Sequence, residues 1–382
     1  MAVATGVAIA NVYYAQPLED TLAHAMRVPV GAVGLVLTLF QVAYAVGLAT
    51  LLPLGDLLER RRLLAAILVV DVAGLVGLAV APGLAVLEVA AVIVGLTTVV
   101  AQILVPFAAH VAAPHEQGRV VSTVMSGLLI GVLVSRTVSG LLAQVAGWRA
   151  VFALGAAATA LVGLPLVRAL PRVAPTTTLT YPRLLASVLA LVREEPVLRL
   201  RMAYGAVQFA SFSAFWSTVG FLLARPPYSW SDAAIGAFAL VGVAGAIAAR
   251  AAGRLADAGH ARPATLGFLL LMVVSYAGMA VGGRHLVALV AGVALMDFGA
   301  QGTHISNQSV IYRLRPDARS RVNTAYMTGY FVAGALGSGL ASVFVYPRFG
   351  WTGVCALGAA FPVLGAGLWC ADRLLGFVER NR

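Results

Sequence analysis

The chain has 382 residues, of which 60% are hydrophobic and only 11% are charged, and its mean hydropathy is +0.92. A soluble domain carries about 25% charged residues, so this composition excludes an ordinary soluble fold and indicates a protein that uses the bilayer as its solvent. The formal net charge of +11 does not indicate nucleic-acid binding, because the basic residues are all Arg and gather in alternate loops.

Apolar stretches long enough to cross a bilayer, about 20 residues each, occur six times before a long polar segment and six times after it. The first six spans are expected near residues 2–24, 31–54, 63–81, 84–109, 119–145 and 150–169. The second six are expected near residues 199–223, 233–252, 264–282, 286–312, 322–346 and 351–371. We therefore predict an all-α integral membrane protein of twelve transmembrane helices in two six-helix bundles, residues 1–169 and 199–382.

The polar segment between the bundles, residues 170–198, is the predicted linker. Its middle, Leu184–Val192, can form a short amphipathic helix on the membrane surface. Residues 1–22 have no basic region before them and no small-residue cleavage site, so we interpret them as the first span and not as a cleaved signal.

The 26 arginines predict the orientation of the spans. Twenty lie in one set of loops, which includes the linker and the C-terminus, and one lies inside the fifth span. The other loops hold the remaining five, Arg27, Arg149, Arg225, Arg284 and Arg348. Arg is enriched on the cytoplasmic side of membrane proteins. We therefore expect a multi-pass protein of the cytoplasmic membrane, with the linker and both termini in the cytoplasm.

The two predicted bundles repeat each other. A shift of about 202 residues places Pro114 on Pro316, Arg119 on Arg321, Met125 on Met327 and Gly127 on Gly329, and brings the Gly147-Trp148 pair near Gly350-Trp351. Parallel repeats of six spans are the internal symmetry of one architecture of secondary transporters. The repeat therefore predicts a transporter more strongly than any single motif does.

The loop after the second span, Gly55–Arg62, has a C-terminal echo in Gly253–Arg262. With these loops, the sequence resembles the major facilitator superfamily over essentially its whole length. The first span, with Asn-x-Tyr-Tyr-x-Gln-Pro at Asn11–Pro17, and the tenth span, Asp297–Gln308, are similar to the bacterial drug-efflux-like branch, the drug/proton antiporters. The fifth span has no Gly-Pro pair, so the antiporter signature is incomplete.

The resemblance implies alternating access, in which two bundles rock about a site near the middle of the membrane. It favours proton-coupled efflux of a small solute, with proton-coupled uptake of a small metabolite as the alternative. A polytopic membrane enzyme and a sensor that transports nothing are alternatives from other classes. We expect no cofactor other than a proton gradient, no metal and no nucleic acid; the expected partners are a small-molecule substrate and the lipid bilayer, and the expected state is a monomer.

A polar stripe in the tenth span is the first candidate site. Asp297 lies about 16 Å from the outer end of that span, near the midplane. Gln301, His304 and Gln308 follow on the same helical face, and Asn307 lies beside them. Asp297 and His304 can both exchange protons, so either could couple transport. The alternative is interhelical hydrogen bonding that only holds the bundle together.

Two more ionisable residues lie inside predicted spans. An isolated charge in lipid costs several kcal/mol, so Arg136 should face the cavity or an acid, and its candidate partners are Asp71, Asp297 or an anionic substrate. A structural salt bridge is an equal alternative. Asp71 has apolar sequence neighbours and is either a third proton-carrying candidate or a peripheral residue.

Aromatic and amide side chains on other spans are expected to line the cavity and to suit a flat or amphiphilic solute. They are Asn11, Tyr14, Gln16, Tyr44, Gln102, Gln208, Trp216, Tyr326 and Tyr330. The loop residues Asp56, Arg60, Arg61, Asp257 and Arg262 are expected to control gating, because each acid can interact with the dipole of a helix N-terminus in one state.

Overall fold

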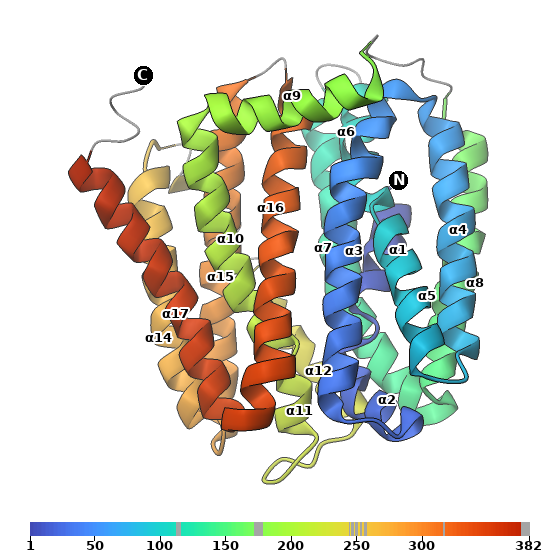
Figure 1. The fold of residues 1–382 in the computed structure, drawn as a ribbon, viewed down its shortest axis with the longest axis vertical. Helices are drawn as coiled ribbons and strands as arrows, with labels where there is room; N and C mark the ends of the chain where they lie inside the picture. The colour runs from blue at the N-terminus through green and yellow to red at the C-terminus, as the bar shows by residue number, and fades with distance from the viewer. Residues whose placement is uncertain are drawn as a thin grey trace. The chain divides into compact units, whose positions relative to one another are not determined.

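The computed structural model describes residues 1–111, 116–171, 179–243, 258–315 and 318–375, together with residues 245, 248, 251, 252, 254 and 255. Helix is the only regular secondary structure in these residues (Figure 1), which confirms the predicted all-α class. The described part of the chain contains nine helical runs that are long and apolar enough to cross a membrane. One of them, Arg319–Leu374, covers two predicted spans.

The described chain divides into two compact units. Unit 1 consists of Met1–Leu185 and Ser229–Leu240, and unit 2 consists of Ala186–Tyr228 and Val241–Arg382. The predicted C-terminal bundle includes residues 229–240, which the structure packs with unit 1.

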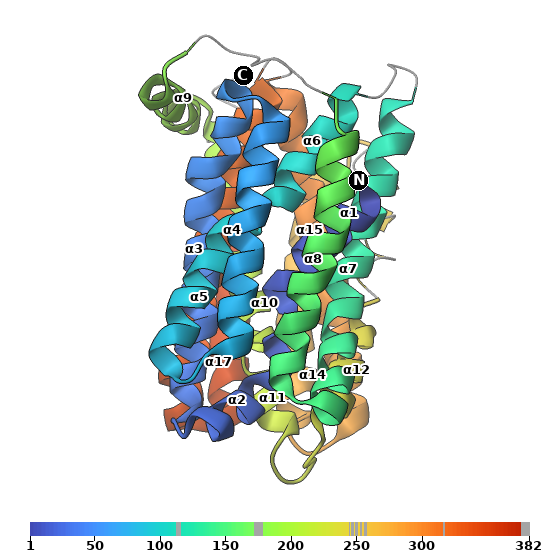
Figure 2. The same ribbon diagram turned by 90° about the vertical axis from the view of Figure 1, so that its right-hand side faces the viewer.

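Unit 1 contains eight α-helices, a 3-10 turn and the short α12 among its described residues. They are α1 (Ala2–Tyr13), η1 (Gln16–Leu18), α2 (Glu19–Met26), α3 (Val30–Leu57), α4 (Arg60–Val80), α5 (Leu84–Thr97), α6 (Val100–Val111), α7 (Gln117–Ala146), α8 (Trp148–Ala169) and α12 (Asp232–Phe238). Helix α1 packs against α7 and α8, and α4 packs between α5 and α8 (Figure 2). Unit 1 therefore encloses polar residues of α1, α4, α5 and α8 in one interior.

Unit 2 is built from α10 (Pro196–Trp216), α11 (Val219–Leu223), α14 (Ala261–Val281), α15 (Leu286–Leu314), α16 (Arg319–Gly339) and α17 (Tyr346–Leu375). A π-helical segment, Leu340–Val345, joins α16 to α17, and a second short turn, η2, covers Ala239–Gly242 at the boundary of the units. Helix α10 packs against α16 and α17, and α14 packs against α15. The face shared by α10, α15 and α16 carries most of the polar residues considered below.

Glycines let helices approach closely where lipid provides no hydrophobic drive for packing. Gly127 and Gly131 of α7 lie so close to the backbone of α1 that neither leaves room for a Cβ, and Gly337 of α16 meets the backbone of Ala210 in the same way. Gly140 of α7 makes this contact with α12. The glycines of the fifth span therefore fix two helix contacts inside unit 1.

Two predicted spans are interrupted at equivalent positions. The first span breaks between α1 and η1 at Tyr14–Ala15, and the seventh breaks between α10 and α11 at Ser217–Thr218. The shift of 202 residues that reveals the sequence repeat places Tyr14 on Trp216. The Gly-Trp pairs show the same correspondence, because Gly147 and Gly350 both have positive φ, 81° and 59°, and each directly precedes its Trp.

The linker contains α9 (Tyr181–Glu194), a longer helix than the predicted Leu184–Val192. Figure 1 shows α9 lying crosswise to α10, which follows it. Leu184 and Leu191 are buried on its inner face. At its start the Tyr181 hydroxyl donates to the backbone oxygen of Thr50 at 3.0 Å.

Candidate functional site

Asp71 lies at the centre of a buried polar cluster in unit 1. One carboxylate oxygen accepts a hydrogen bond from Asn11 Nδ2 at 2.9 Å, and the other accepts from Thr97 Oγ1 at 2.7 Å. Thr98 Oγ1 lies 3.5 Å from the second oxygen, and Asn11 also reaches Thr159 Oγ1 at 3.3 Å. Only 1% of Asp71 is exposed, so the peripheral interpretation is wrong.

Arg136 contacts the first span on another side. Its Nε donates to Gln16 Oε1 at 2.7 Å, and its guanidinium lies 4.6 Å from the ring centre of Tyr13. The break after α1 places these groups, since Gln16 begins η1 and Ser139 of α7 donates to the Tyr14 carbonyl at 2.6 Å. Arg136 is therefore held by an amide and an aromatic face, neither of which was among its predicted partners.

The other predicted residues of unit 1 lie either in its interior or at the junction of α3 and α4. Tyr44 is fully buried and interacts with Gln102, which is partly exposed. Arg60 pairs with Asp56 at 3.3 Å and also donates to the Gly55 carbonyl, so these predicted gating residues contact each other at the junction of α3 and α4. Arg61 is partly exposed in the first turn of α4.

In unit 2, part of the predicted stripe joins a chain of polar contacts. Tyr326 Oη lies 3.3 Å from His304 Nδ1 and accepts from Asn307 Nδ2 at 3.3 Å. Asn307 Oδ1 in turn accepts from Arg201 at 3.3 Å, and Arg201 donates to Thr265 Oγ1 at 3.0 Å. The chain connects α10, α14, α15 and α16.

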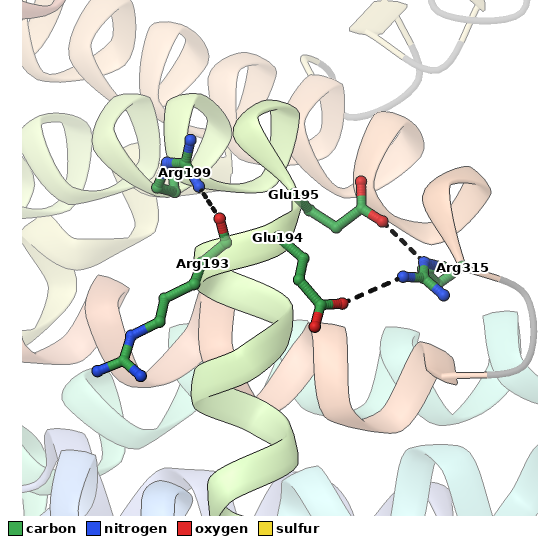
Figure 3. A network of polar contacts seen from close by, with 5 residues as sticks. All are labelled: Arg193, Glu194, Glu195, Arg199 and Arg315. Carbon is green, nitrogen blue, oxygen red and sulfur yellow. Dashed lines mark hydrogen bonds and ion pairs between the residues drawn. The ribbon is translucent and has the colours of Figure 1, made fainter. Parts of the chain in front are cut away.

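Arg201 is a functional candidate that the sequence interpretation missed. The orientation argument counts it among the loop arginines, but it lies inside α10 and is only 6% exposed. Its neighbour Arg199 is exposed and donates to the carbonyl of Val192 and to that of Arg193, the second of which Figure 3 shows. The sequence alone does not distinguish a buried Arg from an exposed Arg near the end of a span.

Aromatic rings adjoin this polar chain. Tyr330 stacks on Phe209 with ring centres 3.9 Å apart, and His304 lies 4.9 Å from Tyr330. Phe212 continues the row along α10, 6.1 Å from Trp216. The predicted Tyr326, Tyr330, His304 and Trp216 thus belong to one aromatic and polar face of unit 2.

The remaining stripe residues have different degrees of burial. Asp297 is 3% exposed on α15, whereas Gln301 and Gln308 are partly exposed. Gln208 is buried on α10. The proposed pairing of Asp297 with Arg136 stays a prediction, because it joins residues of different units.

Two ion-pair groups lie at the ends of unit 2 helices. Arg262, predicted as a gating residue, pairs with Asp372 of α17 at 2.8 Å, while Asp257 lies outside the described residues. At the start of α10, Arg315 lies 2.7 Å from Glu195 and 3.4 Å from Glu194 (Figure 3), which joins the end of α9 to the end of α15. The described residues contain no cluster of three metal-ligating acid, His or Cys side chains.

Membrane-length helices with buried ionisable and hydrogen-bonding side chains are features of a polytopic membrane protein, and comparison with known proteins gives its class. The model of the Major Facilitator Superfamily matches residues 1–283. An Escherichia coli O157:H7 protein named "Uncharacterized transporter YgaY" is 44% identical over 369 residues, covering 97% of this chain and 93% of that protein. "Probable transporter SCO4007" of Streptomyces coelicolor is 35% identical over 366 residues, covering 96% and 85%.

Solved structures show the same fold at low identity. A bacterial homologue of the human lysosomal transporter Spinster, inward-facing and unoccupied, superposes with a TM-score of 0.76 at 14% identity and covers 100% of this chain and 96% of its own. A D-xylose–proton symporter gives 0.76 at 15% identity, covering 96% and 94%. The chain belongs to the Major Facilitator Superfamily, and it is a transporter and not an enzyme.

Proposed function

We propose that this protein exports a small solute across the cytoplasmic membrane in exchange for protons. The observation that carries the proposal is the face of unit 2 on which His304, Tyr326 and Asn307 form a hydrogen-bonded chain beside the stacked rings of Tyr330 and Phe209. Ligand sites in proteins combine aromatic walls with a few polar groups that fix orientation. This face suits a flat or amphiphilic solute.

The direction of transport is supported by sequence resemblance. The segment Asn11–Pro17 and the tenth span are similar to the drug-efflux-like branch, whose members exchange drugs for protons. Uptake by symport is the alternative, and the fold accommodates it, since one structural neighbour is named as a proton symporter. Direction therefore requires a transport measurement.

The first experiment identifies a ligand for the purified protein. Cationic drugs, nucleosides, sugars and organic acids are screened for a rise in unfolding temperature, because a ligand that binds only the folded state stabilises it. A Tyr330→Ala variant serves as the control. It should lose the shift with a true ligand, because the ring stacked on Phe209 is gone.

The second experiment loads proteoliposomes with the radiolabelled ligand and lowers the external pH. Antiport predicts that the inward proton gradient accelerates ligand release. Accumulation of external ligand under the same gradient would favour symport instead. Release that is independent of the gradient would contradict proton coupling in either direction.

A further inference from the structure

Asp71 is a buried acid whose hydrogen-bond partners are all neutral. Asn11 and Thr97 donate to its two oxygens at 2.9 and 2.7 Å, with Thr98 at 3.5 Å. In the described part of the chain no Arg or His forms an ion pair with it, although 26 arginines are present. The charge of an ionised Asp71 is therefore stabilised only by dipoles.

Among the side chains that the structure describes, those of the helices around Asp71 bring no cation to it. From α1, Tyr14 is close enough to interact electrostatically. On α8 the charged residues are Arg149 and Arg168, in its first and last turns, and Arg149 donates to the Ala81 carbonyl at 2.9 Å. On α5 the charged residue is Glu88, more than two helical turns before Thr97.

This environment contains opposing influences on protonation. Burial away from water favours the neutral acid, whereas hydrogen bonds from Asn11 and Thr97 favour the anion. The nearby Thr98 hydroxyl makes its shorter contact, 2.7 Å, with the Val94 carbonyl. A permanently charged structural acid would be expected to have a cationic partner, since an unpaired buried charge is costly. A buried acid with neutral partners only is therefore a candidate for a group that gains and loses a proton during transport.

A second observation concerns Asn11. Its Oδ1 is buried and has no hydrogen-bond partner, although Asn11 is only 2% exposed. A protonated carboxyl gains an O–H donor that the ionised form lacks. Rotation of the Asn11 amide would turn this oxygen toward both the acid proton of Asp71 and the Thr159 hydroxyl. The cluster can therefore adopt one hydrogen-bond arrangement for each protonation state.

We propose that Asp71 is the residue that carries the coupling proton, in a site closed by Asn11, Thr97, Thr98 and Thr159. This rests on the proposed function, since a proton-coupled transporter needs such a group. In this proposal the face of unit 2 that contains His304 and Asp297 binds the solute and does not carry the coupling proton. Asn11 belongs to the same segment as Tyr13 and Gln16, which hold Arg136, so a change at Asp71 is connected to Arg136 through the first span.

The test is an infrared titration of the purified protein without ligand, which follows the carbonyl band of protonated carboxylic acids. Other carboxyls also titrate, including that of the fully buried Glu19, so the readout is the difference between each variant and the wild type. Asp71→Asn should remove one titrating component of the wild-type band that Asp297→Asn leaves in place. An Asp71→Asn spectrum that has lost no titrating component would overturn the proposal. This readout needs no transport. The infrared result can therefore contradict the Asp71 assignment while pH-driven transport is intact, and transport can be independent of pH while the infrared result agrees with the assignment.

A second variant keeps the acid and alters its partner. Thr97→Val removes a donor to the anion, so the midpoint of the titration should rise by about one pH unit, a tenfold change in proton affinity. Thr303→Val is the matched control, because its hydroxyl bonds the Gly299 carbonyl of its own helix, and it should leave the midpoint unchanged. Equal midpoints in both variants would contradict the assigned site.

The titration is repeated with Na⁺ replacing choline at constant pH and ionic strength. The proposal predicts no change in the Asp71 band. A Na⁺-dependent shift of the midpoint that disappears in Asp71→Asn would show that a metal cation occupies the site, and would overturn the assignment to a proton.

Discussion

Asp71 and Arg201 lie in different units, and both are held by neutral side chains. Asp71 accepts from the Asn11 amide and the Thr97 hydroxyl, and Arg201 donates to Thr265 and Asn307. Inside a membrane, such partners reduce the cost of a charge without cancelling it. Neutral partners do not neutralise the charge, so an ion of opposite charge can still bind there. Arg262 and Asp372, at the ends of their helices, already neutralise each other.

Arg201 gives a prediction on stability. Arg201→Ala removes the donor to Asn307 and Thr265 and leaves buried acceptors unsatisfied, at a cost of about 1–3 kcal/mol. The unfolding temperature in detergent should fall, whereas Arg199→Ala, at an exposed position two residues away, should change it little. Equal effects of both substitutions would show that the Arg201 contacts do not contribute.

Individual residues show where sequence reasoning reached its limit. Asp71 and Arg136 could be selected because an ionisable group in an apolar span is unusual. Thr97 and Thr98 could not, because threonine is common in membrane helices, and Arg201 could not, because it lies near a span end. The partners of a buried charge depend on packing between helices distant in sequence.

At the scale of helices, α7 fixes the position of the first span through glycine. Gly131→Ala would force its Cβ against the backbone of Gly6 and should destabilise the protein by about 1–3 kcal/mol. Gly267→Ala is the control, because a Cβ there meets no atom within 4 Å and alanine favours helix by about 1 kcal/mol. Thermal unfolding should separate the two, and a neutral Gly131→Ala would contradict the close packing of α1 on α7.

The junction of α3 and α4 gives a prediction on gating. Asp56→Asn removes the ion pair with Arg60 but keeps the side-chain shape. If this loop controls the exchange between states, the variant should change the rate of ligand exchange severalfold and leave equilibrium affinity nearly unchanged. The check compares both quantities in proteoliposomes, and a large loss of affinity at normal turnover would place Asp56 in the binding site.

The helices themselves were largely predictable, because apolar length and the 202-residue repeat are visible in the sequence. The interruptions were not predicted, although the repeat relates two of them, Tyr14–Ala15 and Ser217–Thr218. Local helix breaks depend on which polar groups find partners in the packed bundle. The association of α12 with unit 1 likewise depends on contacts between distant segments, such as Thr21 with Asp232 at 2.6 Å.

At the scale of the whole molecule, the distribution of arginine predicts orientation in the membrane. In a background with Cys355 and Cys370 replaced by alanine, single cysteines are introduced as Ser229→Cys and Thr180→Cys, both at exposed positions. In intact cells an impermeant thiol reagent should label only the first, because the linker is predicted to be cytoplasmic. Equal labelling of both would contradict this topology.

The central claim is that solute and proton movements are linked, and linkage is reciprocal for binding. Proteoliposomes that contain a pH-sensitive dye and the identified ligand, with equal pH inside and outside, are diluted into ligand-free buffer. Ligand leaving through the wild type should draw protons in and acidify the interior, whereas Asp71→Asn should release ligand without this change. Wild-type release with no acidification would contradict the account.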